Sequence, residues 1–385
     1  MKTSSSGRSA STDTRPGGIG FDVLMKALAD QRWQTRLQLA VRTGLSARTV
    51  DRVVRQLLDE ELLEEGPPLP GLGRPAVPVR LRHRQRLVGT VALHRDGISS
   101  AVISDDGSIH GLIRDTQRRW TDIDDLTGLC RDMLAASMAG MTPVSIDAFV
   151  LGFPLPYEQN VGHRPLQRDR SYSQRWMRGN LSAELNTALG IPVAVDNTCR
   201  LAALAEHRFG AARDCDDVIY LQLVGGSNTG IIAGGRLLRG TNGFAGEISH
   251  LHVQTDGPPC PCGAKGCLGV CIQNSDRLIA TWRHLLPEVA DVYEVLNLAA
   301  QGDSRLRELL YELGLFMGEY LAAGCIMLNP ERLVIDGSLG LAVGPVVAGV
   351  TAALKARLPD RVFESLTVTP GRLGSEAALM GAAAL

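Results

Sequence analysis

The cysteine cluster between Cys260 and Cys271 constrains this chain more than any other stretch. Four of the eight cysteines lie within these twelve residues. Cys260 and Cys262 flank a proline in a turn that two further prolines stiffen, and two glycines let the chain curl back to Cys267. Thiolates at this spacing bind one metal ion with tetrahedral geometry, which is typical of structural zinc. The sequence therefore predicts a structural Zn²⁺ site.

The fourth ligand of this site is left open by the spacing. His250, ten residues before the first cysteine of the cluster, can complete a Cys3His set, but Cys271 and His252 compete for the same position. Disulfides and unpartnered buried thiols are the alternatives to a metal. No secretory signal precedes the chain, so stable disulfides are not expected.

The length of 385 residues predicts two or three domains with a substantial core. The chain contains no run of about eighteen apolar residues, which argues against a membrane span. Its residue usage is that of an ordinary α/β protein, and we expect it in the cytoplasm.

Charge is unevenly distributed along the chain. The net charge is −1, but residues 1–86 carry fifteen Lys and Arg against nine Asp and Glu, a balance of +6, which leaves −7 for the remainder. A basic front end on an acidic body suggests that the front end meets a polyanion.

The front end shows a helical pattern after a polar tail. Residues 1–17 contain almost nothing apolar and are expected to be disordered. A helical apolar period begins at Ile19, and two more helices are expected at about 35–42 and 47–60. Four apolar side chains of the middle helix are expected to pack inward: Leu37, Leu39, Ala40 and Val41.

A sharp turn joins the second and third helices. Gly44 can adopt the left-handed conformation that such a turn requires, and Ser46 is a favourable N-cap. The third helix has a single apolar stripe, and its free face carries Arg48, Thr49 and Arg52. This arrangement is typical of a helix-turn-helix; an ordinary amphipathic hairpin with solvated arginines is the alternative.

The residues that follow favour the DNA-binding alternative. A loop rich in glycine and proline, tipped by Arg74, lies between two short strand-like segments and predicts a wing. Arginine suits a narrow minor groove, where negative potential is concentrated. We therefore expect a winged helix-turn-helix domain at residues 18–86. Its predicted DNA contacts are Ser46, Arg48, Thr49, Arg52 and Arg74.

From residue 87 onward, strands alternate with helices, which predicts an α/β body. The chain resembles transcriptional regulators of the ROK family, whose name abbreviates repressor, open reading frame and kinase. The matching words of the winged module are L-A-V-R-T-G-L-S-A-R-T-V and G-L-G-R-P. Those of the body are R-G-T-N-G-F-A-G-E-I-S-H, C-P-C-G-A-K-G-C and N-P-E-R-L-V-I-D-G-S-L-G.

The resemblance implies a two-lobed sugar kinase/actin-like (ribonuclease H-like) body with a structural zinc site. We expect the first lobe at residues 87–200 and the second at 201–385, with the last helix returning to the first lobe. The implied zinc ligands are His250, Cys260, Cys262 and Cys267. The implied sugar contacts are Asn197, Glu247 and His250.

Kinases of the family use two acidic motifs that this chain lacks. Their D-x-G-G-T turn cradles phosphate and holds magnesium; here Val91 replaces the carboxylate, while Leu93 and His94 replace the glycines and are expected to fill the phosphate's space. Their N-D-x-N-A-A-A-L-x-E motif supplies the general base. Counting back from Glu206 places Thr198 at the base position, and a neutral hydroxyl cannot serve as that base.

Two further residues bear on the site. Asp196 could replace the missing base only if the strand slipped, which the alternation of strand faces opposes. The glutamate that contacts the sugar in the family, two residues after the last zinc cysteine, is Gly269 here.

The sequence thus predicts a non-enzymatic transcriptional regulator, most simply a repressor, that binds operator DNA as a homodimer and senses a carbohydrate-like effector. The alternatives are a ROK sugar kinase with an accessory DNA-binding domain and a DNA-binding regulator with a silent effector site.

Overall fold

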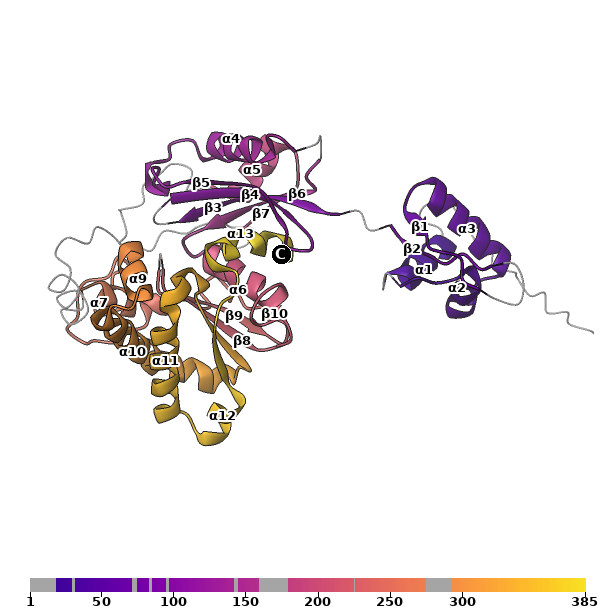
Figure 1. Cartoon of the computed structure of the whole chain (residues 1–385). Helices are drawn as coiled ribbons and strands as arrows, with labels where there is room; N and C mark the ends of the chain where they lie inside the picture. Colours follow the sequence, from indigo (N-terminus) through magenta and orange to yellow (C-terminus); the bar gives the residue numbers. More distant parts are fainter. Residues whose placement is uncertain are drawn as a thin grey trace, which may run out of the picture. The chain divides into compact units, whose positions relative to one another are not determined.

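The computed structural model describes residues 19–29, 32–70, 75–82, 85–94, 97–141, 145–158, 179–224, 226–274 and 292–385. The chain divides into two compact units, Met1–Gln85 and Arg86–Leu385 (Figure 1). Each is described below by itself.

The described residues of the front unit form three helices and a small sheet. The helices are α1 (Ile19–Leu28), α2 (Arg36–Thr43) and α3 (Ala47–Asp59). Strands β1 (Leu63–Glu65) and β2 (Val79–Leu81) pair antiparallel. Gly44 ends α2 with φ of 70°, and the Ser46 side chain accepts a hydrogen bond from the Thr49 amide at the start of α3. The turn and the cap therefore form as their sequence predicts.

The apolar face of α2 differs from the prediction. Leu39 is fully buried in the core of the unit, but Leu37 and Val41 are 73% and 79% exposed. Leu37 and Val41 are four residues apart and share one face of the helix, whereas Leu39 lies on nearly the opposite face. A single helix packed against one core therefore cannot bury all three side chains. The prediction that Leu37 and Val41 pack inward is wrong.

The first lobe of the body is a five-stranded sheet in the order β5-β4-β3-β6-β7. Neighbours β5, β4 and β3 pair antiparallel, whereas β3, β6 and β7 pair in parallel. Helices α4 (Leu126–Met138) and α5 (Leu181–Leu189) cover one face (Figure 1). The strands are β3 (Leu87–His94), β4 (Gly97–Ser104), β5 (Ile109–Asp115), β6 (Ala148–Phe153) and β7 (Val193–Asn197).

The second lobe contains a five-stranded sheet in the order β10-β9-β8-β11-β12. Its strands are β8 (Val218–Gln222), β9 (Asn228–Ala233), β10 (Arg236–Leu237), β11 (Arg332–Ile335) and β12 (Thr367–Pro370). The helices of this part of the chain are α6 (Thr198–Arg208), α7 (Leu268–Asn274), α9 (Val292–Ala300), α10 (Ser304–Leu328), α11 (Val343–Arg357), α12 (Asp360–Ser365) and α13 (Ala377–Met380).

Two helices connect the lobes. Helix α6 begins directly at the end of β7 and packs against β8 and β9 of the second lobe. Helix α13 returns from the second lobe to the first sheet, where Ala378 and Leu379 join a buried cluster with Ala92 and Ile103 (Figure 1). The inner face of the first sheet is therefore covered by the chain's last turns.

Helices α10 and α11 pack closely against each other through glycines. A Cβ atom at Gly314 would lie 2.3 Å from the carbonyl oxygen of Val346, and one at Gly318 would lie 2.7 Å from the Cβ of Ala353. Gly324 does not share this role, because its nearest neighbour is an Ile219 side-chain atom at 3.8 Å.

Two segments, Ser304–Leu328 and Gly337–Arg357, are long and apolar enough to cross a membrane by length and composition alone. Both contribute side chains to one shared core, including Leu306, Met317 and Val350. Core helices of soluble proteins pass the same test, so this is weak evidence for a membrane span.

The glycine contacts predict opposite effects for two substitutions in α10. Gly314→Ala should lower the free energy of unfolding by about 1–3 kcal/mol, because the methyl group overlaps the backbone of α11. Gly324→Ala has room for its methyl group and should leave stability unchanged or raise it by up to about 1 kcal/mol, the helix-propensity difference. Urea unfolding of both variants measures this; equal destabilisation would contradict the packing described.

Candidate metal centre and effector cleft

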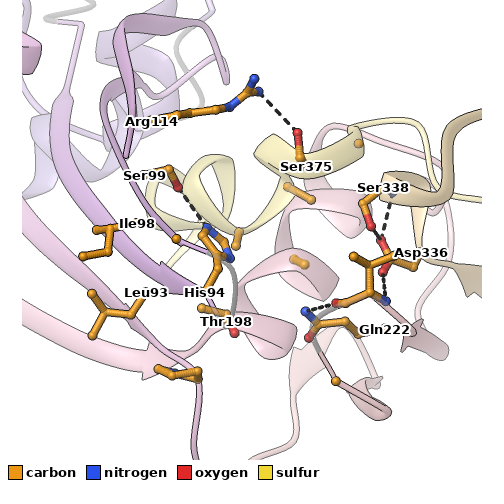
Figure 2. A pocket seen from close by; sticks show the side chains of 18 of the residues that line it. Leu93, His94, Ile98, Ser99, Arg114, Thr198, Gln222, Asp336, Ser338 and Ser375 are labelled. Atoms are coloured by element: carbon orange, nitrogen blue, oxygen red, sulfur yellow. Dashed lines mark hydrogen bonds between the residues drawn. The ribbon is translucent and has the colours of Figure 1, made fainter. Parts of the chain in front are cut away.

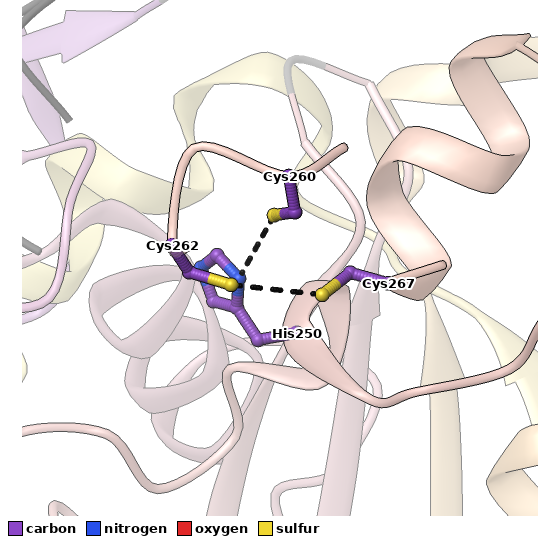
Figure 3. A group of neighbouring side chains, drawn as sticks. All are labelled: His250, Cys260, Cys262 and Cys267. Carbon is purple, nitrogen blue, oxygen red and sulfur yellow. Dashed lines mark hydrogen bonds between the residues drawn. The ribbon is translucent and has the colours of Figure 1, made fainter. Parts of the chain in front are cut away.

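Four predicted metal ligands come together in the second lobe. The ligand atoms of His250, Cys260, Cys262 and Cys267 all lie within 4.8 Å of one another (Figure 3). Cys262 Sγ lies 3.6 Å from Cys267 Sγ, and Cys260 Sγ lies 3.6 Å from His250 Nδ1. Sulfur atoms around a tetrahedral zinc at about 2.3 Å are about 3.8 Å apart. The donor set and its spacing thus suit one tetrahedral metal ion.

Local backbone geometry creates this arrangement. His250 ends a short 3-10 turn, Ile248–His250, and Cys267 directly precedes α7. Gly266 has φ of 65°, and a Cβ atom there would lie 1.7 Å from the Gln254 carbonyl oxygen, so only glycine fits. Burial lowers the pKa of His250, which favours the neutral imidazole that binds metals.

The competing ligands are placed elsewhere. The Cys271 thiol donates to Gln254 Oε1 at 3.5 Å and does not belong to the cluster. His252 is exposed and pairs through its backbone with Cys267.

The loop that leads to the metal centre holds a second polar group. Glu247 Oε2 accepts a hydrogen bond of 2.8 Å from Asn228 Nδ2, and Asn228 Oδ1 accepts one of 3.3 Å from the Ser249 amide. Burial raises the pKa of Glu247 to about 7, against the opposing effects of Arg200 and Asn228. The carboxyl group can therefore accept or donate hydrogen bonds near neutral pH.

Asn197 performs a structural task at the start of α6. Its Oδ1 accepts hydrogen bonds from the amides of Cys199 and Arg200 at 2.8 and 3.3 Å, and its Nδ2 donates to the Leu155 carbonyl at 3.2 Å. It is only 2% exposed. The Asn197 side chain therefore serves as the N-cap of α6, and the second N–H of its Nδ2 group is available to a ligand.

A buried ion-pair network follows β7. Asp196 is fully buried, and its two oxygens lie 3.3 Å from Arg200 Nη1 and 2.8 Å from Arg239 Nε. Arg200 Nη2 also donates to the carbonyls of Tyr157 and Gly243 at 3.4 and 3.2 Å. This network was missed from the sequence, although Asp196 and Arg200 are only four residues apart, one at the end of β7 and the other in the first turn of α6.

A cavity of about 670 Å³ lies between the lobes (Figure 2). His94 and Ser99 line it from the first sheet, where His94 Nε2 lies 2.9 Å from Ser99 Oγ. Asp336 and Ser338 line it from the second lobe. Among the predicted effector contacts, Asn197 lines this cavity, whereas Glu247 and His250 are not among its described lining residues.

A family model described as the ROK family matches residues 171–385, more than half of the chain. The chain belongs to the ROK family. The xylose repressor of Bacillus subtilis (strain 168) is 22% identical over 369 residues, which cover 94% of this chain and 93% of the repressor. The transcriptional dual regulator NagC of Escherichia coli (strain K12) is 24% identical, with 91% and 88% covered. A glucokinase of Halalkalibacterium halodurans is 28% identical over 223 residues, covering 54% of this chain and 67% of the glucokinase.

Solved structures show the same fold. A ROK family transcriptional regulator, a homologue of the E. coli MLC protein, has a TM-score of 0.71 at 23% identity and covers 95% of this chain and 94% of its own. A ROK glucokinase from Streptomyces griseus has a TM-score of 0.62 at 23% identity and covers 77% of this chain and 98% of its own. The ROK kinase fold therefore matches a smaller share of this chain than the regulator fold does.

The kinase motifs of the ROK family are altered in ways that the structure locates. Thr198 is the first residue of α6 and lines the cavity. His94 also faces the cavity (Figure 2), as expected for a residue that fills the phosphate's space. Leu93 also lines the cavity, although its side chain is buried in one cluster with Val91.

The loss of the family's glutamate at Gly269 coincides with a change nearby. A Cβ atom at Gly269 would lie 3.1 Å from the Cβ of Ser249 and 3.3 Å from its carbonyl oxygen. The family pattern has glycine where this chain has Ser249. A larger residue at 269 therefore requires Ser249 to shift.

The predicted DNA-contacting residues divide into three groups. Arg48 and Arg52 are exposed on α3 and have no side-chain partner among the described residues. Ser46 caps the helix, and the Thr49 hydroxyl lies 2.8 Å from Ser46 Oγ in a side chain that is 8% exposed, which argues against Thr49 as a base reader. Arg74 lies outside the described residues.

The cluster geometry predicts which cysteine is needed for metal. The Cys262→Ser variant should bind far less metal than the about one ion per chain that a tetrahedral site holds. It should also have a lower melting temperature, because metal binding is linked to folding. Cys271→Ser should retain the metal. Elemental analysis of both purified variants tests this, and metal loss from the Cys271 variant alone would contradict the assignment.

Proposed function

We propose that the protein is a DNA-binding transcriptional repressor whose ROK body senses a carbohydrate-like effector. The observation that carries this proposal is a front unit whose helix α3 carries Arg48 and Arg52, both exposed and without a side-chain partner among the described residues, joined to a ROK body without the kinase base. Alignment with the xylose repressor over 94% of this chain supports it, because so long an alignment includes most of the front unit.

The front unit would read DNA through α3. An α-helix fits the major groove, and the N-terminal residues of a recognition helix contact base edges. Arg48 and Arg52 would make these contacts, while Ser46 fixes the start of the helix. Arg74 would enter the adjacent minor groove from the wing.

A homodimer follows from the size of this unit. One small module gives modest affinity, whereas two modules on successive turns of the duplex recognise a palindrome. Effector binding in the body would alter the spacing of the two front units and so release the operator. A structural Zn²⁺ held by His250 and the three clustered cysteines would fix the loop that carries Glu247 and His250, two of the proposed effector contacts. The repressor would act in the cytoplasm.

The body is proposed to lack kinase activity. Thr198 cannot remove a proton from a sugar hydroxyl, and Asp196 is committed to two arginines, so it cannot replace the missing base. The competing hypothesis, a sugar kinase with an accessory DNA-binding domain, has support from the similarity to a glucokinase. A coupled assay of ATP consumption with a panel of sugars distinguishes the two. We expect no sugar-dependent turnover.

Substitutions on α3 test the DNA-binding claim. The metal-loaded chain should select a small set of genomic fragments, and Arg48→Ala and Arg52→Ala should each weaken this binding by about 1–3 kcal/mol. Arg55→Ala is the matched control, because Arg55 lies on the same helix but is engaged by Asp51. Its effect should be clearly smaller. Equal losses for all three variants, or no specific fragment at all, would contradict the proposal.

A regulator with a silent effector site is the remaining alternative. Any ligand that binds the native state must raise the melting temperature. A thermal-shift screen in which no sugar stabilises the protein would favour that alternative.

A further inference from the structure

The carboxyl ends of two neighbouring parallel strands meet at the second-lobe wall of the cavity. Strands β8 and β11 pair in parallel, and the amide of Asp336, the residue after β11, donates to the Leu221 carbonyl at 2.8 Å. Asp336 and Val224, which lies two residues beyond β8, both line the cavity. Ligands of open α/β sheets bind outside the carboxyl ends of the strands. This wall is therefore where the fold presents backbone groups to the cavity.

The Asp336 carboxylate collects the hydrogen-bond donors at these two strand ends (Figure 2). Its Oδ2 accepts the amides of Leu223 and Val224 at 3.1 and 3.0 Å. Its Oδ1 accepts the amide and the hydroxyl of Ser338 at 2.9 and 2.6 Å, and the hydroxyl of Tyr220 at 3.2 Å. Three backbone amides and two hydroxyl groups thus converge on one anionic group.

Hydrogen bonds alone balance the charge of Asp336. It is 2% exposed and has no ion-pair partner in the described part of the chain, whereas the buried Asp196 is paired with two arginines. Burial, together with the nearby Asp336 charge, raises the pKa of Tyr220, so its hydroxyl stays protonated and remains a donor. Backbone N–H groups that point into one concavity make an anion-binding site. The donor set around Asp336 is that of an oxyanion site.

We propose that these five donors form an oxyanion-binding site that the chain keeps filled with its own Asp336 carboxylate. The site faces the cavity, but a phosphate group or another small oxyanion cannot use its donors while the carboxylate is in place. A phosphorylated ligand in the cavity would have to bind its phosphate elsewhere. The inference goes beyond the proposed function and depends neither on operator binding nor on the effector.

Two substitutions empty this site in the metal-loaded full chain. Asp336→Gly removes the heavy atoms of an acetate ion, and Asp336→Ala removes those of a formate ion. Both variants should melt at a lower temperature than the native chain, because buried donors lose their acceptor. Acetate should raise the melting temperature of the Gly variant, and formate that of the Ala variant, by about 2–4 °C more than it raises that of the native chain.

Thermal melts with chloride at the same ionic strength correct for general salt effects. Inorganic phosphate is the phosphate-bearing probe, and it should stabilise the Gly variant more than the native chain. A cap with no capacity to bind an external anion predicts no such gain, because water would then replace the carboxylate as the acceptor.

Two control variants separate an emptied site from a lost charge. Asp336→Asn fills the same space without charge, so the anions should not stabilise it. Asp115→Ala is the matched control, because Asp115 also lines the cavity and accepts two amides, those of Gln117 and Arg118 at 2.9 and 3.1 Å. Its removal also frees Arg118 from an ion pair. Those donors lie on exposed residues that water can reach, so we expect no comparable gain.

An anion response confined to the Gly and Ala variants supports the inference. Equal stabilisation of the native chain, of Asp336→Asn or of Asp115→Ala would overturn it, as would the absence of any response in the emptied variants. If these variants are recovered only as aggregates, refolding in acetate or formate should restore them. Refolding that fails equally in chloride and in these anions would also overturn the inference.

Discussion

The ion pair centred on Asp196 is the constraint on which the arrangement of the effector site depends. A fully buried carboxylate is stable only when it is paired, and here both partners are arginines from different segments. Through Arg200 the pair also fixes the backbone at Tyr157 and Gly243, one in each lobe. Removing Asp196 would take away the ion-pair partner of the buried Arg200 guanidinium at the point where β7 passes into α6.

The proposed metal centre would supply the second fixed point. It would hold His250 at the far end of the loop that Arg239 begins, so that polar interactions would tie the loop at both ends. Glu247 lies between these two ends. A loop held in this way presents its polar groups in defined positions, which is what recognition of a hydroxyl pattern requires.

Local signals in the sequence predicted the parts of the structure that depend on local chemistry. The turn at Gly44 and the cap at Ser46 follow from backbone and side-chain preferences alone. Cysteine spacing predicted the clustered thiols, whereas His250 as the fourth member of the cluster was implied by the resemblance to the ROK family. The exposure of Leu37 was missed because a short helix has one buried face, and hydropathy does not say which.

Longer-range features could not be predicted. The pairing of Asp196 with Arg239 joins residues that are 43 positions apart, and no local pattern connects them. Thr49 looked like an exposed polar residue, but the helix turns it toward Ser46.

Effector-dependent footprinting is the most direct test of a ROK body without its kinase base that acts through a module binding operator DNA. The metal-loaded chain should protect a palindromic site on a selected genomic fragment, with two half-sites about one helical turn apart. One carbohydrate should abolish this protection at a concentration near its own dissociation constant. Protection of a single half-site that no carbohydrate alters would contradict the account.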